Sequence, residues 1–327
     1  MFFDVITFGS STWDIFIRDK EISSSKSSSF LTNKGICFSL GSKIDIDELH
    51  FFSGGGGSNS AATFLSLGFK TAYCGMVGDD PAGEEIIQEM KRKGADTSFI
   101  IKNKKKPTNH SFVLSIPGKD RTILTYRGAS DEFSLKEIPF GKLKSKWFYL
   151  APLSGKTCYA FSKIVDFAHS RGIRVAANPG TSQLSLPKNK LRNILKKVDI
   201  LFLNKEEASM LVGVSYNNEK EILKKMAEFY SGTFVMTKGS KGLVVIDGKY
   251  SYTVGIAKSK VVDRTGAGDS FGSGLLAGIM LKNDIEYAIQ LGSANASSCL
   301  REWGAKNGLL KRGERFKKIK IEKNEIN

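Results

Sequence analysis

The sequence contains few of the residues that build disulfide frameworks or metal clusters. Its 327 residues include four cysteines and three histidines. No C-x-x-C pair is present and the cysteines lie far apart, so we expect buried thiols rather than a disulfide scaffold or a zinc site. These cysteines are Cys37, Cys74, Cys158 and Cys299.

Long apolar segments are also missing. No run reaches the roughly eighteen apolar residues that a membrane-spanning helix needs. The opening MFFDVITFGSSTWD carries an acid, Asp4, where a secretory signal would have a basic flank before an apolar run. We therefore expect a cytoplasmic protein without a membrane partner.

Two common nucleotide-binding motifs are absent as well. No G-x-x-x-x-G-K-[ST] occurs anywhere, which excludes a P-loop protein, and no G-x-G-x-x-G follows the first predicted strand. A dinucleotide-dependent dehydrogenase is therefore not expected. Any nucleotide must be held by a different arrangement of glycines.

The formal net charge of +16 raises the question of nucleic-acid binding. The basic residues are spread widely, with local clusters only at 102–106 and 311–323, and no helix-turn-helix, zinc-finger or RNA-binding signature accompanies them. We expect a solvated Lys-rich surface that attracts anionic nucleotide, and no nucleic-acid partner. A basic nucleic-acid-binding protein is the alternative.

The order of predicted elements indicates an α/β fold. Short β-branched runs alternate with helical patterns, which implies βαβ units and a parallel sheet. Strands are expected at 3–8, 71–77, 147–150, 173–177, 200–203, 233–237, 243–246 and 250–254. Helices are expected at 58–67, 81–93, 157–170, 188–195, 219–230, 267–281 and 285–300.

A second group of short β segments interrupts this alternation. Strands at 111–116 and 121–126 are joined by the turn residues PGKD, and further short segments occur at 36–40 and 49–52. We predict a doubly wound, mostly parallel sheet flanked by helices, with a small β lid. The core comprises residues 1–11, 54–107 and 129–312, the lid 12–53 and 108–128, and a basic tail that frays 313–327.

The motif DRTGAGD, from Asp263 to Asp269, stands directly before a helix rich in small residues. Glycines at a helix start let backbone N–H groups converge on an anion, and the helix N-terminus adds partial positive charge. Asp269 would lie beside that anion and could accept a proton from an attacking hydroxyl. The alternative is a glycine-rich helix start that Asp269 merely caps.

A second glycine turn, Gly54 to Gly57, also precedes a small-residue helix and has Asn59 in its first turn. A linker would not normally run straight into a helix, whereas a loop that approaches a ligand closely would. The amide of Asn59 can donate and accept hydrogen bonds to sugar hydroxyls. The pair of turns favours phosphoryl transfer to a small polyol.

Together these motifs resemble the ribokinase (PfkB-type) carbohydrate kinases over nearly the whole chain. The resemblance rests on GGGGSN, N-x-x-E, TKGSKG, DRTGAGD and NASSCLREWGA, in this order. It implies a ribokinase-like fold and an ATP- and Mg²⁺-dependent kinase that phosphorylates a hydroxyl of a small sugar or sugar derivative. It also implies a homodimer formed through the lid.

The resemblance assigns roles to individual residues. Asp269 is implied as the catalytic base, and the turn before it as the anion hole for the transferring phosphoryl group. The anion-hole residues are Gly266, Ala267 and Gly268. The implied substrate residues are Asp14, Gly55, Gly56, Asn59 and Arg127, of which Asp14 accepts hydrogen bonds from two hydroxyls.

The remaining implied roles concern the nucleotide and the cations. Asn204 and Glu207 would organise Mg²⁺, with Glu207 acting through water, which suits the retained water shell of that ion. Asp263 and Thr265 match positions that hold a monovalent cation, K⁺, in some members. The residues matched to the nucleotide site are Thr237, Gly239 and, near the adenine, Asn295.

Departures from the family pattern narrow the substrate but leave alternatives open. Residues 178–181 read NPGT where relatives acting on keto-acids or fructose carry D-x-N-x-R, and Gly56 replaces a Lys of ribose-specific members. A sugar or sugar derivative other than ribose is favoured. A nucleoside kinase, with Trp13 or Phe112 stacking a base, is the alternative, and a non-catalytic nucleotide or sugar sensor is the rival.

Overall fold

The structure is a computed structural model that describes residues 1–19, 24–27, 34–116, 121–256 and 260–326. The predicted PGKD turn lies outside the described residues. The main sheet is ten-stranded, in the order β16-β15-β14-β13-β12-β11-β10-β1-β6-β7. Its strands are β1 (Phe3–Phe8), β6 (Thr71–Gly78), β7 (Ile100–Asn103), β10 (Ser145–Leu150), β11 (Arg174–Ala177), β12 (Ile200–Asn204), β13 (Thr233–Thr237), β14 (Leu243–Ile246), β15 (Tyr250–Val254) and β16 (Ile321–Glu325).

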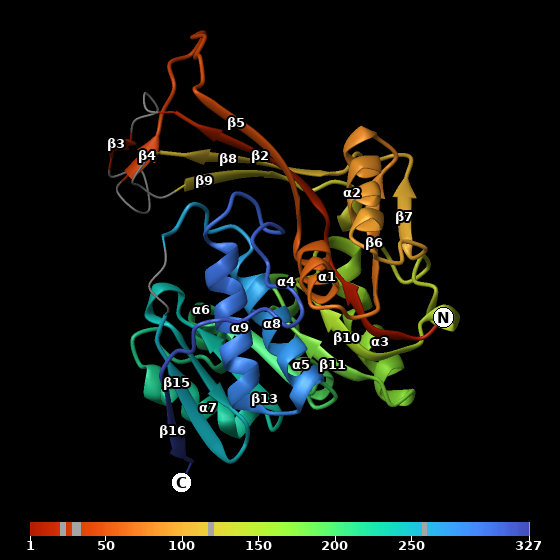
Figure 1. Ribbon diagram of the computed structural model, residues 1–327, viewed down its shortest axis with the longest axis vertical. Helices are drawn as coiled ribbons and strands as arrows, with labels where there is room; N and C mark the ends of the chain where they lie inside the picture. Colours follow the sequence, from red (N-terminus) through yellow and green to blue (C-terminus); the bar gives the residue numbers. More distant parts are fainter. Residues whose placement is uncertain (20–23, 28–33, 117–120, 257–259, 327) are drawn as a thin grey trace.

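The neighbouring strands β7, β6, β1, β10, β11, β12 and β13 pair in parallel. The pairs β13–β14, β14–β15 and β15–β16 are antiparallel. Helices connect the parallel strands, as the alternation predicted (Figure 1). The helices are α1 (Gly56–Ser66), α2 (Pro81–Arg92), α3 (Gly155–Ser170), α4 (Thr181–Leu184), α5 (Lys188–Leu195), α6 (Lys205–Val212), α7 (Glu219–Phe229), α8 (Ala267–Lys282) and α9 (Ile285–Cys299). The predicted fold class is confirmed.

Helices cover both faces of the main sheet because its inner strands are apolar on both sides. On β10, Trp147 and Tyr149 pack with side chains of α1, α8 and α9, whereas Phe148 and Leu150 pack with α3, α5, α6 and α7. Successive strand residues point to opposite faces, so this alternation divides the core into two layers. Helices α8 and α9 pack directly against each other.

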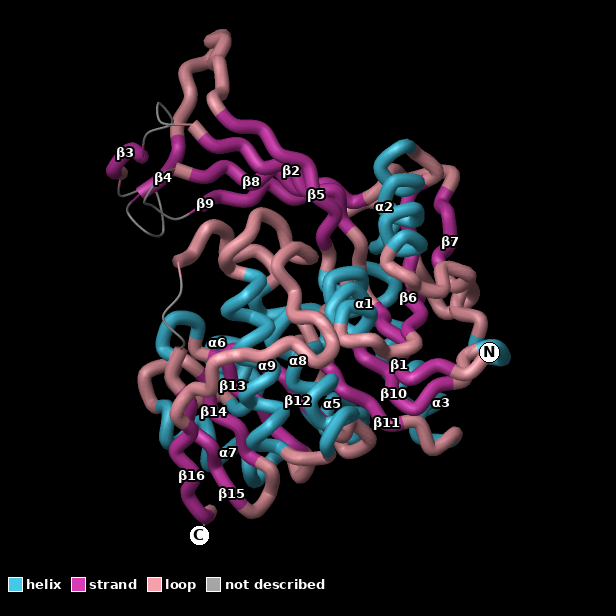
Figure 2. The backbone as a smooth tube through the Cα atoms, in the orientation of Figure 1, coloured by secondary structure: helices cyan, strands magenta, loops and turns pink. Residues whose placement is uncertain are grey.

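The second sheet has four strands in the order β5-β2-β8-β9 and projects from the core (Figures 1 and 2). They are β2 (Thr12–Arg18), β5 (Glu48–Gly54), β8 (Asn109–Ser115) and β9 (Arg121–Tyr126), and a short pair, β3 (Ser24–Lys26) and β4 (Lys34–Ile36), lies nearby. Residues directly opposite each other share a face. One face therefore carries the row Phe52, Asp14, Ser111 and Thr125, and the other carries Phe51, Ile15, Phe112 and Leu124.

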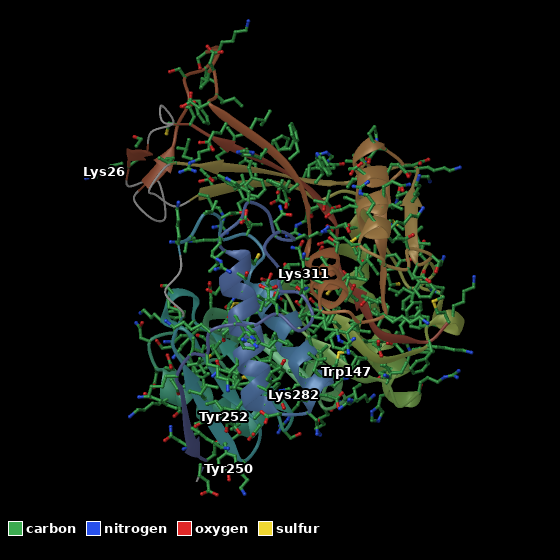
Figure 3. The ribbon with its side chains drawn as sticks, viewed as in Figure 1. Lys26, Trp147, Tyr250, Tyr252, Lys282 and Lys311 are labelled. Atoms are coloured by element: carbon green, nitrogen blue, oxygen red, sulfur yellow. The ribbon has the colours of Figure 1, made fainter. Side chains whose placement is uncertain are left out.

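The C-terminal tail does not fray as predicted. Strand β16 pairs antiparallel with β15 and extends the main sheet. The ammonium of Lys323 lies 4.3 Å from the ring centre of Tyr250, which stands with Tyr252 at the end of the molecule away from the lid (Figure 3). Backbone pairing and cation–π contacts thus order a segment whose charge suggested a free tail.

Two other expectations were tested by the structure. Cys37 is exposed, so the prediction that all four cysteines are buried was wrong for this one, whereas the other three are buried. Among the residues that the structure describes, no helix has the length and apolar character needed to cross a membrane.

Candidate active site

Hydrogen bonds and packing contacts fix the conformation of the turn before α8. Gly266 is the N-cap of α8 with φ 75°, a conformation that favours glycine, and a Cβ there would come within 2.2 Å of the Ala305 Cβ. Asp263 accepts hydrogen bonds from the backbone N–H and the hydroxyl of Thr265, at 3.0 and 2.9 Å, and from the N–H of Gly304 at 3.2 Å. The turn is therefore a fixed element that presents the first N–H groups of α8.

Asp269 lies in the first turn of α8. Its Oδ2 accepts a hydrogen bond from Asn59 Nδ2 at 2.9 Å. The residue as a whole is half-buried, but its carboxylate is enclosed, and this burial raises the pKa of Asp269 while the hydrogen bond from Asn59 opposes the rise. A raised pKa suits a carboxylate that must accept a proton.

The two glycine turns meet at Asp269. Gly55 caps α1 with φ 94°, and a Cβ at Gly56 would lie 3.4 Å from Asp269 Oδ1. A Cβ at position 56 would press on the Ala151 Cβ, at 3.0 Å, and would stand in contact with the carboxylate. Packing of α1 on α8 brings the turns together from segments about 210 residues apart. This proximity is the central geometric feature of the site.

Asp14 lies at the other end of the first glycine turn. A Cβ at Gly54 would come within 1.9 Å of Asp14 Oδ2, and the hydroxyl of Ser111 donates to Asp14 Oδ1. Burial raises the pKa of Asp14 to about 6, although the Ser111 hydrogen bond and the charge of Lys306 act in the opposite direction. The turn thus runs from one buried carboxylate, Asp14, to a second, Asp269.

A cavity of about 660 Å³ opens at the N-terminus of α8. Its size lies in the range of ligand pockets. Ala267 and Gly268 line one part, and apolar side chains of β14, α8 and α9 line much of the rest, among them Leu243, Phe271 and Ala296. The cavity can hold a molecule with a phosphate at the helix start and an apolar ring further along.

Thr237 and Gly239 line this cavity, as the sequence resemblance implied for a nucleotide turn. Asn204 stands beside Thr237 in the β12–β13 register. Asn204 and Glu207 form the capping box of α6, in which each side chain accepts the other's backbone N–H at 2.8 Å. Both residues therefore lie at the carboxyl ends of the strands, next to the cavity.

Glu207 fits a role beside a cation. Burial and the like charge of Glu206 raise the pKa of Glu207, against the backbone hydrogen bond at Asn204, so a nearby positive ion would stabilise the carboxylate. Within the described parts of the chain, no group of three or more His, Cys, Asp or Glu residues could hold a metal. A magnesium ion that keeps its waters and binds mainly to phosphates needs no such cage.

The structure corrects the role implied for Asn295. Its side chain is fully buried, donates to the Ser270 carbonyl at 2.8 Å and accepts from the Leu310 N–H at 2.9 Å. It thus ties α9 to α8 and to the C-terminal segment instead of reaching an adenine. Its neighbours Ser293 and Ser297 line the cavity in its place.

Other predicted residues are less directly placed. Arg127 is exposed just beyond the end of β9, and its role at the acceptor stays a prediction. One carboxylate oxygen of Asp263 accepts hydrogen bonds from Thr265 in the turn, and the other accepts one from Gly304 in the C-terminal segment. The role of Asp263 and Thr265 at a monovalent cation stays a prediction.

The C-terminal segment contributes residues that sequence reasoning missed. Trp303 stacks on His50 of the lid with ring centres 5.0 Å apart, and Lys306 is buried against Ser53. NASSCLREWGA drew attention to this region, but of these two residues only Trp303 is an obvious packing residue. The only signal for Lys306 in the sequence is its position directly after Gly304 and Ala305.

Known proteins share the fold and parts of the sequence of this chain. The structure superposes on an Arabidopsis thaliana ribokinase solved with ribose and ATP with a TM-score of 0.76, at 21% identity, covering 95% of this chain and 97% of that one. An uncharacterized sugar kinase of Archaeoglobus fulgidus is 29% identical over 74% of this chain and 96% of its own length. A ribokinase of Haemophilus influenzae is 27% identical over 80% and 85%.

The pfkB family carbohydrate kinase model matches residues 31–312. The chain therefore belongs to the pfkB family of carbohydrate kinases, and the predicted family membership is confirmed.

Proposed function

We propose that this protein transfers the γ-phosphoryl group of ATP to a hydroxyl of a small sugar or sugar derivative. The observation that supports this most is the convergence of Gly56, Asn59 and the α8 turn on the Asp269 carboxylate. The acceptor would lie between Asp14 and Asp269, and ATP would occupy the cavity that begins at Gly268.

The residues account for each requirement of the reaction. Asp269 takes the proton of the acceptor hydroxyl as its oxygen bonds to the γ-phosphorus and the bond from that phosphorus to the β-phosphate oxygen breaks, releasing ADP. The N–H groups at Gly266–Gly268 stabilise the charge on the transferring group. Mg²⁺, when bound near Asn204 and Glu207, would neutralise phosphate charge.

The two aromatic residues that we considered for stacking a nucleoside base do not lie on the Asp14 face of the lid. Phe112 lies on the face of the lid sheet that does not carry Asp14. Trp13 packs with Val77 and Ile86 of the core. Neither aromatic ring therefore shares the Asp14 face, which removes the stacking role considered for them. A nucleoside acceptor is the second outcome of the substrate test.

The test is turnover across a panel of pentoses, hexoses, sugar alcohols and nucleosides with ATP and Mg²⁺. We expect ADP release only when the acceptor is a sugar or a sugar derivative. Turnover with nucleosides alone would move the assignment to a nucleoside kinase. Tight ATP or sugar binding without turnover would favour the sensor, and salt-sensitive binding of DNA or RNA without turnover would favour a nucleic-acid-binding protein.

Acceptor binding is expected to depend on pH through Asp14. As pH falls through about 6, this carboxylate becomes protonated and accepts fewer hydrogen bonds, so the KM for the acceptor should rise about tenfold per pH unit. The KM for ATP should change little. Initial rates of the wild type and of Asp14→Asn from pH 5 to 8 check this, since the variant should lack the inflection near pH 6.

Protonation of Asp14 weakens acceptor binding but stabilises the folded state. Its folded-state pKa is raised, so protonation favours the unliganded folded state below about pH 4, and this contribution is lost as pH rises through about 6. The same carboxylate therefore costs stability at the pH where it binds acceptor. A stabilised folded state with weakened acceptor binding at pH 5 is the combined expectation.

We also propose that a second copy of the chain covers the outer face of the lid, which is the face with Phe51 and Leu124. Both side chains are about half exposed, and large contiguous exposed apolar surfaces usually mark interfaces. Phe51→Glu should therefore shift the protein from dimer to monomer in sedimentation experiments. A monomeric wild type would contradict the proposal.

A further inference from the structure

The cavity at the start of α8 has a single charged residue in its lining. Among the described residues that line it, Arg264 alone carries a charge, and the others are glycine, serine, threonine or apolar residues. Under the proposed function this cavity receives a triphosphate with several negative charges. The N-terminus of a helix supplies only about half an elementary charge to such a ligand. The position of this one guanidinium therefore calls for an explanation.

The two neighbours of Arg264 fix its place beside the anion turn. Asp263 is buried and accepts hydrogen bonds from the backbone N–H and the hydroxyl of Thr265, at 3.0 and 2.9 Å. These hydrogen bonds span Arg264, so its backbone is held two residues before Gly266, the N-cap of α8. The long side chain of an arginine at this place can reach a phosphate group that lies at the start of the helix.

The protein itself does not engage the guanidinium of Arg264. This residue is exposed, and within the described parts of the chain its side chain forms no ion pair and no hydrogen bond. Two other cations near the turn at 237–239 are already paired, because Lys238 and Lys205 both contact Glu219, at 2.7 and 3.1 Å. A planar, permanently charged group with free N–H donors is suited to bind phosphate oxygens through two parallel hydrogen bonds.

We propose that Arg264 binds the diphosphate part of the nucleotide, which is the part that remains in ADP. This inference rests on the proposed kinase function. The N–H groups at Gly266–Gly268 receive the transferring group, so the guanidinium next to them is left for the two phosphates that follow. Negative charge develops on the β-phosphate as its bond to the γ-phosphorus breaks, and Arg264 would stabilise that charge.

The test compares ligands with and without phosphate groups. In Arg264→Gln, the Kd for ADP with Mg²⁺, measured by calorimetry, should rise about 10- to 100-fold, the effect of losing hydrogen bonds to a charged group. The Kd for adenosine should stay the same, because the apolar end of the cavity is unchanged. Added salt should weaken ADP binding less in the variant than in the wild type, because one attractive charge is gone. Arg264→Lys keeps the charge but not the planar fork, so its Kd for ADP should be intermediate.

The matched control is Arg301→Gln, which removes the same charge close to the same cavity. Arg301 is also exposed and donates to the Ser298 hydroxyl at 2.8 Å, and it is absent from the cavity lining that the described residues form. The Kd for ADP of this variant should equal that of the wild type. Both substitutions change an exposed side chain, so urea denaturation should give the wild-type free energy of unfolding for each.

Three results would overturn the proposal. The first is an unchanged Kd for ADP in Arg264→Gln, and the second is an equal loss of affinity for ADP and adenosine. The third is a loss of ADP affinity in Arg301→Gln as large as that in Arg264→Gln, because net charge and not contact would then explain the effect.

The proposed function fails in a different way. A wild-type protein whose ADP affinity depends on Arg264, but which phosphorylates no acceptor, would overturn the kinase assignment and leave the binding role in place. Turnover by a wild-type protein whose ADP affinity does not depend on Arg264 would overturn only the role of Arg264.

Discussion

Asp269→Asn is expected to lower kcat by about 10²- to 10⁴-fold, the usual contribution of a positioned general base. The amide has the shape of the carboxylate, and its oxygen can still accept the hydrogen bond from Asn59, so the turn should keep its structure. The Kd for ATP, measured by calorimetry, should remain within a few-fold of wild type. Steady-state rates with the best acceptor measure the loss.

The matched control is Asp284→Asn, an acid-to-amide change at the start of the neighbouring helix. Asp284 caps α9 and accepts from the Tyr287 N–H at 2.8 Å, a role that Asn fills equally well. Turnover of this variant should equal that of the wild type. Full activity of Asp269→Asn would remove Asp269 from the mechanism, whatever the control shows.

Gly266→Ala is expected to damage both stability and turnover. Its φ of 75° costs an alanine roughly 1–2 kcal/mol, and contact with Ala305 adds about 1–3 kcal/mol of overpacking. We therefore expect the free energy of unfolding to fall by about 2–5 kcal/mol. Displacement of the anion turn should lower kcat by about 10²- to 10³-fold, as for loss of an anion-hole donor.

Gly213→Ala separates the conformational cost from the site. Gly213 ends α6 with φ 71°, and a Cβ there would approach only the flexible end of Lys188, at 3.6 Å. The free energy of unfolding of Gly213→Ala, measured by urea denaturation, should fall by about 1–2 kcal/mol. The kcat of this variant should not change. Equal losses of stability in the two variants would mean that Ala305 does not restrict the α8 turn.

The parts of the site that were predictable from sequence are local ones. The glycine turns and the helix starts after them depend on residues adjacent in the chain, so DRTGAGD could indicate the anion-binding turn with Asp269, and GGGGSN the acceptor-binding turn. The convergence of the two turns was only implied, because it depends on the packing of α1 against α8 on one face of the main sheet.

The features that were missed depend on distant partners or on burial. Lys306 donates a hydrogen bond to Ser53, which lies 253 positions earlier in the chain. The residues adjacent to Lys306 in the sequence do not indicate that contact. Asn295 has the residue type of a ligand contact, but its buried amide bonds to Ser270 of α8 and to Leu310 of the C-terminal segment. The tail residues IEKNE look solvated, yet an open edge of β15 pairs with their backbone whatever their side chains are.

The most direct measurement is a single-turnover reaction with ATP labelled in its γ-phosphate, in the presence of Mg²⁺ and the best acceptor. The wild type should place the label on the acceptor in one rapid phase, and Asp269→Asn should bind the same amount of ATP but transfer the label at least about a hundredfold more slowly. Label that appears only as free phosphate, or transfer at equal rates by both proteins, would contradict the account.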